Sequence, residues 1–379
     1  MKIHNPYLRI FIRLHGTTGT QLSPILWNDW HSIIKFMINI SLNIITYFGI
    51  FINSPVADQL LTETEANSLF RYFQKANFYA FYPLIYAGSI VSYLIYGHHI
   101  IAALDSSAFI KVYNYKRNRY KAIFIFLFIF LFWQQRFILR EYRHLSKSSF
   151  IIRFRTIELM VGIYIYHATQ MTNWYLLFYY QLVTFFTLKQ IVRKLWSNKS
   201  MFRRPGKGMT NSFSIDQRLF RSIILLSEQS RHLQYYFSYI MLFLLIDLSD
   251  SIIGNLSFVM MESFGTGIGW LSLYEQSTRW LLLLALIELN RQNVQLFNHI
   301  DHHFIRKFTA IQIMMKINRH HNDDNEVARY TKYNQLKIYR QYYSLSLFNW
   351  LNVDYSLLIS IFFFSFGYVM LISQTTKIN

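Results

Sequence analysis

Cysteine is absent from this 379-residue chain, and charged residues are few. Without cysteine, neither a disulfide nor a thiolate metal site can form, and no redox compartment can be inferred. Only 15% of the residues are charged, against roughly 25% in soluble domains, which argues against a soluble protein. Hydrophobic residues make up 53% of the chain and aromatic residues 19%. Its stability is therefore expected to come from helix packing.

Several functional motifs are also missing. The first residues include Lys2, Arg9 and Arg13 but no apolar core followed by a small-residue cleavage site, so no signal peptide is expected. No HExxH, Ser-His-Asp arrangement, phosphate loop or carboxylate pair suggests an enzyme, and no cofactor is predicted. The net charge of +19 does not indicate nucleic-acid binding, because the basic residues lie between apolar stretches rather than on one face of a domain.

Apolar stretches recur along the chain, and about 20 such residues suffice for a helix to cross a bilayer core of about 30 Å. They predict an all-α membrane protein, with residues 1–379 forming a single domain. The seven predicted spans are 32–52, 76–104, 122–139, 157–188, 233–253, 268–289 and 353–374. The fourth is too long for one crossing and should project into water or tilt strongly. Segment 203–212 is predicted to be a flexible loop.

The direction of the spans follows from lysine and arginine, which are in excess on the cytoplasmic side. Placing the N-terminus inside puts most of them, in 105–121, 189–232 and 291–343, on that side, although the basic segment 140–156 falls outside. The C-terminus is then extracellular. Receptors coupled to G proteins run the other way. The chain also lacks their outer-face cysteines, the Asp-Arg-Tyr triplet after the third span and the Asn-Pro-x-x-Tyr of the seventh.

The last span contains a spaced pair of polar residues. Gly367 and Tyr368 are followed by Val-Met-Leu-Ile-Ser, then Gln374 and Thr375. This pattern resembles that of insect gustatory receptors and, more distantly, insect odorant receptors, where the seventh span has Thr-Tyr, five hydrophobic residues and Gln-Phe. Here Gly367 replaces the threonine and Thr375 the phenylalanine. The run "SLFNWLN", residues 346–352, loosely resembles the small-Leu-Phe stretch of the same family.

The resemblance implies a ligand-gated, non-selective cation channel in the plasma membrane of chemosensory neurons. Four subunits, all alike or mixed with related receptors, would surround one pore lined by the seventh span. The inner parts of spans four to six and the start of the seventh would form a cytosolic anchor.

The resemblance also implies that the constriction of the pore falls at Leu371. The predicted pore residues are Phe363, Gly367, Tyr368, Leu371 and Gln374. Helical spacing places four of them on one stripe, with Tyr368 beside it. The alternative is that Gln374 is an interface anchor and Tyr368 packs on a neighbour.

Polar and aromatic side chains inside the spans predict a ligand site. Helical rise places residues from spans two to six at similar depths in the outer half of the membrane. The predicted ligand-binding residues are Tyr82, Tyr86, Trp133, Gln134, Tyr164, His167, Asp247, Glu275 and Arg279. Aromatic faces with a few polar groups suit a small organic tastant. Glu275, Arg279 and Asp247 could equally form a structural ion network, and the aromatics could be core.

Two further motifs receive simpler interpretations. "FNHIDHHF", residues 297–304, places two histidines on one helix face, but these are only part of a zinc ligand set. No metal site is predicted, and the segment is expected to extend the sixth helix. The residues on its predicted packing face are Val294, Phe297, Ile300, Phe304 and Phe308. Asn255 begins a glycosylation sequon on the predicted outer side.

Two other functions stay open at this point. The chain could be a seven-span receptor that signals through a cytosolic partner, or a membrane transporter or enzyme that uses the charged trio. The ligand is not specified by the sequence, but Val369 follows the tyrosine where sugar-sensing relatives often carry an acidic residue. A non-sugar ligand is therefore mildly favoured.

Overall fold

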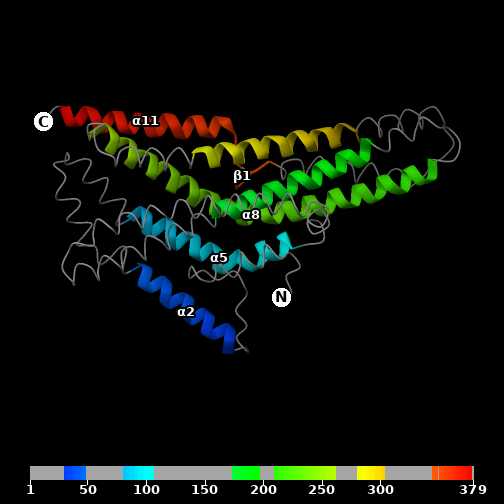
Figure 1. Ribbon diagram of the computed structural model, residues 1–379, viewed down its shortest axis with the longest axis horizontal. Coiled ribbons are helices and arrows are strands. Elements are labelled where there is room, and N and C mark those ends of the chain that lie inside the picture. Colours follow the sequence, from blue (N-terminus) through cyan, green and yellow to red (C-terminus); the bar gives the residue numbers. More distant parts are fainter. Residues whose placement is uncertain are drawn as a thin grey trace.

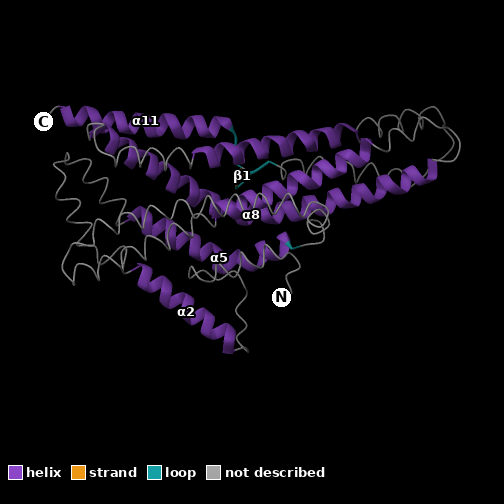
Figure 2. Cartoon of the chain, in the orientation of Figure 1, coloured by secondary structure: helices purple, strands orange, loops and turns teal. Residues whose placement is uncertain are grey.

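The computed structural model describes residues 30–47, 80–105, 173–196, 209–261, 280–303, 344–348 and 350–377. Nearly all of these residues are helical (Figures 1 and 2). The helices are α2 (Trp30–Tyr47), α5 (Tyr82–Leu104), α8 (Met209–Met261) and α11 (Tyr355–Lys377), together with helices over 173–196 and 280–303. Each overlaps a predicted span. The third predicted span lies outside the described residues.

Helix α8 is the central element of the described structure. It is 53 residues long and contacts α5, α11 and strand β1 (Ser346–Leu347). Its buried apolar side chains recur at intervals of three and four, as in Leu233, Phe237, Ile240 and Leu244, which is the pattern of a helix with one packed face. In Figure 1 the helix runs across most of the molecule, with α5 on one side and α11 on the other. Helix α5, helix α11 and strand β1 therefore all pack on α8.

One large apolar core joins these helices. It includes Tyr180 of helix 173–196, whose ring stacks on Phe237 at 5.5 Å, and Phe297 of helix 280–303, which is 1% exposed. Ile300 is also buried and Val294 is half-buried. The predicted packing face of the extended sixth helix is therefore seen as far as residue 303.

Helix α5 approaches α8 closely at Gly88. An added Cβ at this glycine would lie 2.0 Å from Cζ of Phe243, so only a glycine fits there without movement of the ring. Pro83 opens α5, where a missing N–H is tolerated. Residues 83–104 form the one helix within the described ranges that is long and apolar enough to cross a membrane, and residues 355–371 form a shorter apolar helix.

One local expectation was wrong, and one short element was not predicted. Residues 209–212 are helical rather than part of a flexible loop, because they begin a long helix in which each further residue adds a hydrogen bond at low cost. The described structure is mostly helical, in agreement with the predicted fold class, but it also contains a short hairpin that was not predicted. Strands β1 and β2 (Leu351–Asn352) form a short antiparallel hairpin in which Ser346 pairs with Asn352. Its turn has no glycine, so the sequence carried no clear hairpin signal.

Candidate functional site at the base of the last helix

Helix α11 begins at a side-chain cap that immediately follows the hairpin. Oδ1 of Asp354 accepts hydrogen bonds from the backbone N–H of Ser356 at 3.0 Å and of Leu357 at 3.2 Å. An aspartate in this position satisfies N–H groups that have no partner within the helix. The hairpin therefore leads directly into α11, and its position sets the position of the helix.

Asn290 holds the hairpin from helix 280–303. Its Nδ2 donates to the carbonyl oxygen of Val353 at 2.9 Å, and its Oδ1 accepts from the N–H of Leu345 at 2.7 Å. The N–H of Val353 donates in turn to the carbonyl of Leu345 at 2.9 Å. Asn290 is 3% exposed, so both of its bonds form away from water, where an unpaired polar group is costly. One amide thus fixes both ends of the hairpin.

Helix α8 holds the other side of the hairpin. Oγ of Ser238 donates to the carbonyl of Ser346 at 3.3 Å and accepts from the N–H of Phe348 at 3.2 Å. One turn earlier, Nε2 of Gln234 donates to the carbonyl of Ser344. Both α8 side chains are buried. The hairpin is therefore bound to two helices far from it in sequence.

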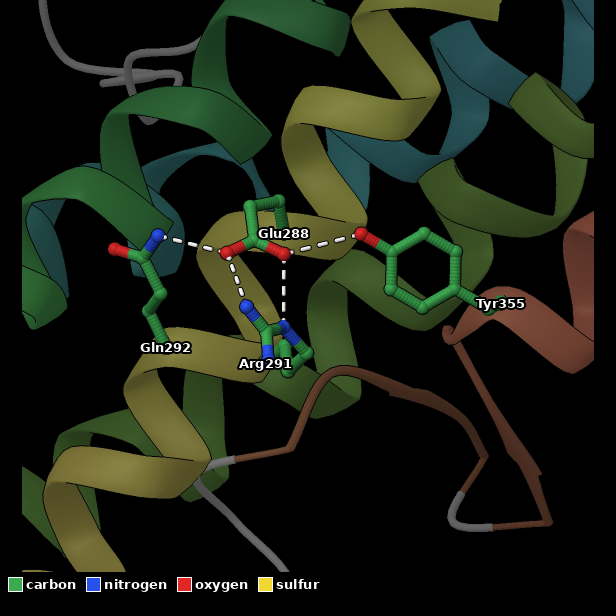
Figure 3. A network of polar contacts seen from close by, with 4 residues as sticks. All are labelled: Glu288, Arg291, Gln292 and Tyr355. Carbon is green, nitrogen blue, oxygen red and sulfur yellow. Dashed lines mark hydrogen bonds and ion pairs between the residues drawn. The ribbon is translucent and has the colours of Figure 1, made fainter.

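A charged network ties the first residue of α11 to helix 280–303 (Figure 3). The phenol of Tyr355 donates to Oε2 of Glu288 at 3.0 Å. The same carboxylate accepts two bonds from Arg291, at 2.7 and 2.8 Å, and one from Gln292 at 2.8 Å. Hydrogen bonding to this carboxylate raises the pKa of the Arg291 guanidinium, which stays charged. The network is exposed, so it aligns the two helices more than it stabilises the fold.

The two faces of α11 differ strongly in burial. Leu357, Ile361, Ser365 and Val369 are buried, and their spacing of four residues places them on one face. Phe363 is 67% exposed and Leu371 is 53% exposed, while an added Cβ on Gly367 would meet nothing within 4 Å. Gln374 is exposed and Tyr368 is half-buried. The four residues of the predicted stripe all lie on the open side of α11.

That open side forms part of a large exposed apolar surface. Its exposed large side chains are Ile359, Phe362, Phe363, Phe364, Phe366, Met370 and Leu371. Soluble monomers rarely expose an apolar surface of this kind, which usually meets another protein or lipid. Helix α11 is therefore held firmly at its base and on one face, while its other face is free for further contacts.

Two of the predicted ligand-binding residues can be placed on adjacent helices. Tyr86 of α5 is 2% exposed and lies in a small apolar cluster with Ile85 and Ile90, against which Phe243 and Ile246 of α8 pack. Asp247 follows Ile246 in α8 and is 3% exposed. The structure therefore brings the helical segments that carry Tyr86 and Asp247 together.

The other predicted positions are less defined. Trp133, Gln134, Tyr164, His167, Glu275 and Arg279 lie outside the described residues. Tyr82 is the first residue of α5 and Asn255 lies within α8, but their side chains are not among those described. Helix α8 continues to Met261, past the predicted end of the fifth span. The described residues contain no group of three or more His, Asp or Glu side chains arranged to hold a metal.

The sequence reasoning missed a buried polar group between α5 and helix 173–196. The phenol of Tyr93 donates to Oδ1 of Asn173, whose Nδ2 donates to Oγ of Ser89 at 3.3 Å. All three side chains are buried. Serine and asparagine within apolar stretches were the available signal, because such groups require partners away from water.

A scan against known protein families finds no match, and no curated protein matches the chain. A solved structure does match: the insect olfactory receptor OR5 from Machilis hrabei, in complex with eugenol, with a TM-score of 0.56 and 11% sequence identity. The alignment covers 97% of this chain and 98% of the receptor. The chain has the fold of an insect olfactory receptor. This fold extends over almost the whole chain.

Proposed function

We propose that this protein is a gustatory-type chemoreceptor that acts as a ligand-gated, non-selective cation channel. The arrangement of α11 carries the proposal: its base is clamped, one face is buried and an apolar stripe is open. The olfactory receptor fold supports the broader class of chemoreceptor. The spaced Tyr368 and Gln374 favour the gustatory type, and Val369 favours a ligand other than a sugar.

The chain would cross the plasma membrane of a chemosensory neuron seven times, with its N-terminus inside and its C-terminus outside. Helix α8 has 53 residues, a length of about 80 Å, while a bilayer core is about 30 Å thick. Much of α8 would therefore extend into the cytosol. There it would form an anchor with the inner parts of helices 173–196 and 280–303 and with the hairpin.

Four copies of the chain, or a mixture with related subunits, would place the open stripes of their α11 helices around one pore. Leu371 would form the constriction, since a ring of leucines can block ions by excluding water. Gln374 would add a ring of amides one turn outside it. Four apolar surfaces turned toward each other and toward lipid would also explain why a single copy leaves them uncovered.

A small organic tastant would bind in the outer half of the helices. The similar receptor was solved with eugenol, and the Tyr86 region with nearby Asp247 would supply an aromatic and an acidic contact here. Tyr82, Trp133, Gln134, Tyr164, His167, Glu275 and Arg279 are the further proposed members of this site. Ligand binding would favour the open pore because the two states differ in affinity for the ligand.

Reconstitution of the purified chain into liposomes tests the channel. We expect one or more compounds from a panel of small aromatic and alkaloid molecules, eugenol included, to evoke cation current. Liposomes without protein are the control. Silence across the panel, with signalling restored only by a cytosolic partner in cells, would overturn the channel and favour a partner-coupled receptor.

A glycosylation tag added at the C-terminus tests the predicted direction of the chain. The tag should be modified if the C-terminus is outside the cell.

A further inference from the structure

A chain of aromatic contacts connects α5 to the hairpin beneath α11. The ring of Tyr96 in α5 stacks on Tyr239 of α8, with centroids 5.5 Å apart and an interplanar angle of 20°. On its other side, Tyr239 meets Phe348 edge to face, at 5.0 Å and 81°. We call Tyr96, Tyr239 and Phe348 the aromatic bridge. It spans three elements that are distant in sequence.

Phe348 holds an unusual backbone conformation. Its φ is 51°, the only positive φ among the non-glycine residues that the structure describes. A bulky side chain rarely adopts this region, so surrounding contacts must hold the turn in place. Here the contacts are the bond from the N–H of Phe348 to Ser238 and the edge-on packing against Tyr239. The turn is therefore a strained element that its neighbours stabilise.

The bridge joins the two parts of the molecule that the proposed function must connect. Tyr96 lies ten residues after Tyr86 on α5, about 15 Å along the same helix. Phe348 lies in the hairpin that Asn290 and Asp354 link to the start of α11. Tyr96 and Tyr239 are half-buried and Phe348 is 38% exposed, and rings in direct contact still restrict one another's movement. A displacement of α5 at Tyr96 would therefore move the hairpin turn.

We propose that Tyr96, Tyr239 and Phe348 are positioning residues that couple α5 to the base of α11. The inference rests on the proposed function for its purpose, but its physical content is a mechanical link that exists without ligand. When α5 shifts, the bridge releases or re-forms the strained turn at Phe348, and α11 tilts on its base. The turn at Phe348 therefore has two states, formed and released, and both α5 and α11 influence which of them is populated.

Tyr235 provides a matched control on the same helix. Its ring contacts Tyr96 at 5.9 Å and Tyr239 at 5.8 Å, but it is 53% exposed and lies beside the bridge rather than within it. Removal of the Tyr235 ring leaves the contacts of Tyr96 with Tyr239 and of Tyr239 with Phe348 in place. If substitutions only loosen the tyrosine cluster in general, Tyr235→Ala and Tyr96→Ala should have the same effect on the hairpin. If the bridge is a specific link, only substitution of a bridge residue should affect the hairpin.

Hydrogen exchange at the hairpin, measured on the full chain in lipid nanodiscs without ligand, tests the link. Tyr96→Ala, a change in α5, should accelerate exchange of the Phe348 and Trp350 amides about 2- to 10-fold, the range for an aromatic pair. Tyr96→Phe should restore slow exchange because it keeps the ring. Tyr235→Ala should leave both amides unchanged.

A double variant completes the test. Tyr96→Ala combined with Tyr239→Leu should accelerate exchange no more than Tyr239→Leu alone, since either change breaks the same chain of contacts. If Tyr96→Ala does not fold, Tyr96→Leu replaces it. Unchanged exchange in the Tyr96 variants, or equal acceleration in Tyr235→Ala, would overturn the bridge. These outcomes do not depend on current, so a silent channel would count against the proposed function alone.

Discussion

Tyr355 and Glu288 join the first turn of α11 to helix 280–303 through a single hydrogen bond of 3.0 Å. Sixty-seven positions separate them in the chain, yet the bond lies at the point where the fold must set the direction of α11. Since Glu288 also binds Arg291 and Gln292, the phenol meets a carboxylate that is already fixed in place. The direction of the last helix is therefore set from outside it.

Replacement of Glu288 should have more effect than replacement of Tyr355. Tyr355→Phe removes one donor, whereas Glu288→Gln weakens bonds from three side chains. Tyr355 is exposed and the Glu288 side chain is 33% exposed, so we expect small losses of thermal stability, larger for Glu288→Gln. The thermal midpoint in detergent at low and high salt measures this, and salt should reduce the difference. An effect of Tyr355→Phe equal to that of Glu288→Gln would contradict the network.

Asn290→Ala should destabilise the protein strongly. The substitution leaves the buried N–H of Leu345 and the carbonyl of Val353 without their partner, at a cost of about 1–3 kcal/mol for each group. We expect a lower thermal midpoint and less protein at the cell surface. Gln295→Ala, an exposed amide on the same helix, is the control and should have little effect. Equal stability of the two variants would show that the clamp is dispensable.

Leu371→Ala tests the proposed constriction. Truncation of an apolar ring widens it and admits water, so the resting cation current should rise several-fold. Phe362→Leu alters an exposed ring that packs on Trp280, away from the stripe, and should leave the resting current unchanged. Whole-cell recording at matched surface expression gives the comparison. A resting current that stays at the wild-type level in Leu371→Ala would argue against the pore.

Asp247→Asn examines the proposed ligand site. Replacement of this carboxyl group should raise the half-maximal concentration of an active cationic compound about tenfold or more, because charge-assisted contacts are strong. Glu228→Gln, an exposed acid on the same helix, should behave like the wild type. Dose-response curves for both variants decide, and an unshifted curve for Asp247→Asn would remove this residue from the site.

Gly88→Ala should disturb the contact between α5 and α8. The new methyl group would lie 2.0 Å from the ring of Phe243 unless that ring moves, and overpacking of this kind costs about 1–3 kcal/mol. We expect a lower thermal midpoint, which Phe243→Leu should partly restore in the double variant because the smaller side chain leaves room. Additive losses in the double variant would indicate a different cause.

The sequence by itself determined the apolar segments of the described helices, their order and the stripe on α11. These properties depend on residues three or four positions apart, so Phe363, Gly367 and Leu371 could be assigned to one face from spacing alone. The spaced Tyr368 and Gln374 also predicted a fold shared with insect odorant receptors, and the similarity to the insect olfactory receptor structure agrees with that fold.

Only the tertiary structure decided how the base of α11 is held. Asn290 meets residues 55 and 63 positions away, and Ser238 meets the hairpin more than 100 positions away. No local pattern encodes such contacts, because a buried amide or hydroxyl finds its partner only once the helices have packed. The positive φ of Phe348 has the same origin: tertiary contacts hold a conformation that the residue would not adopt alone.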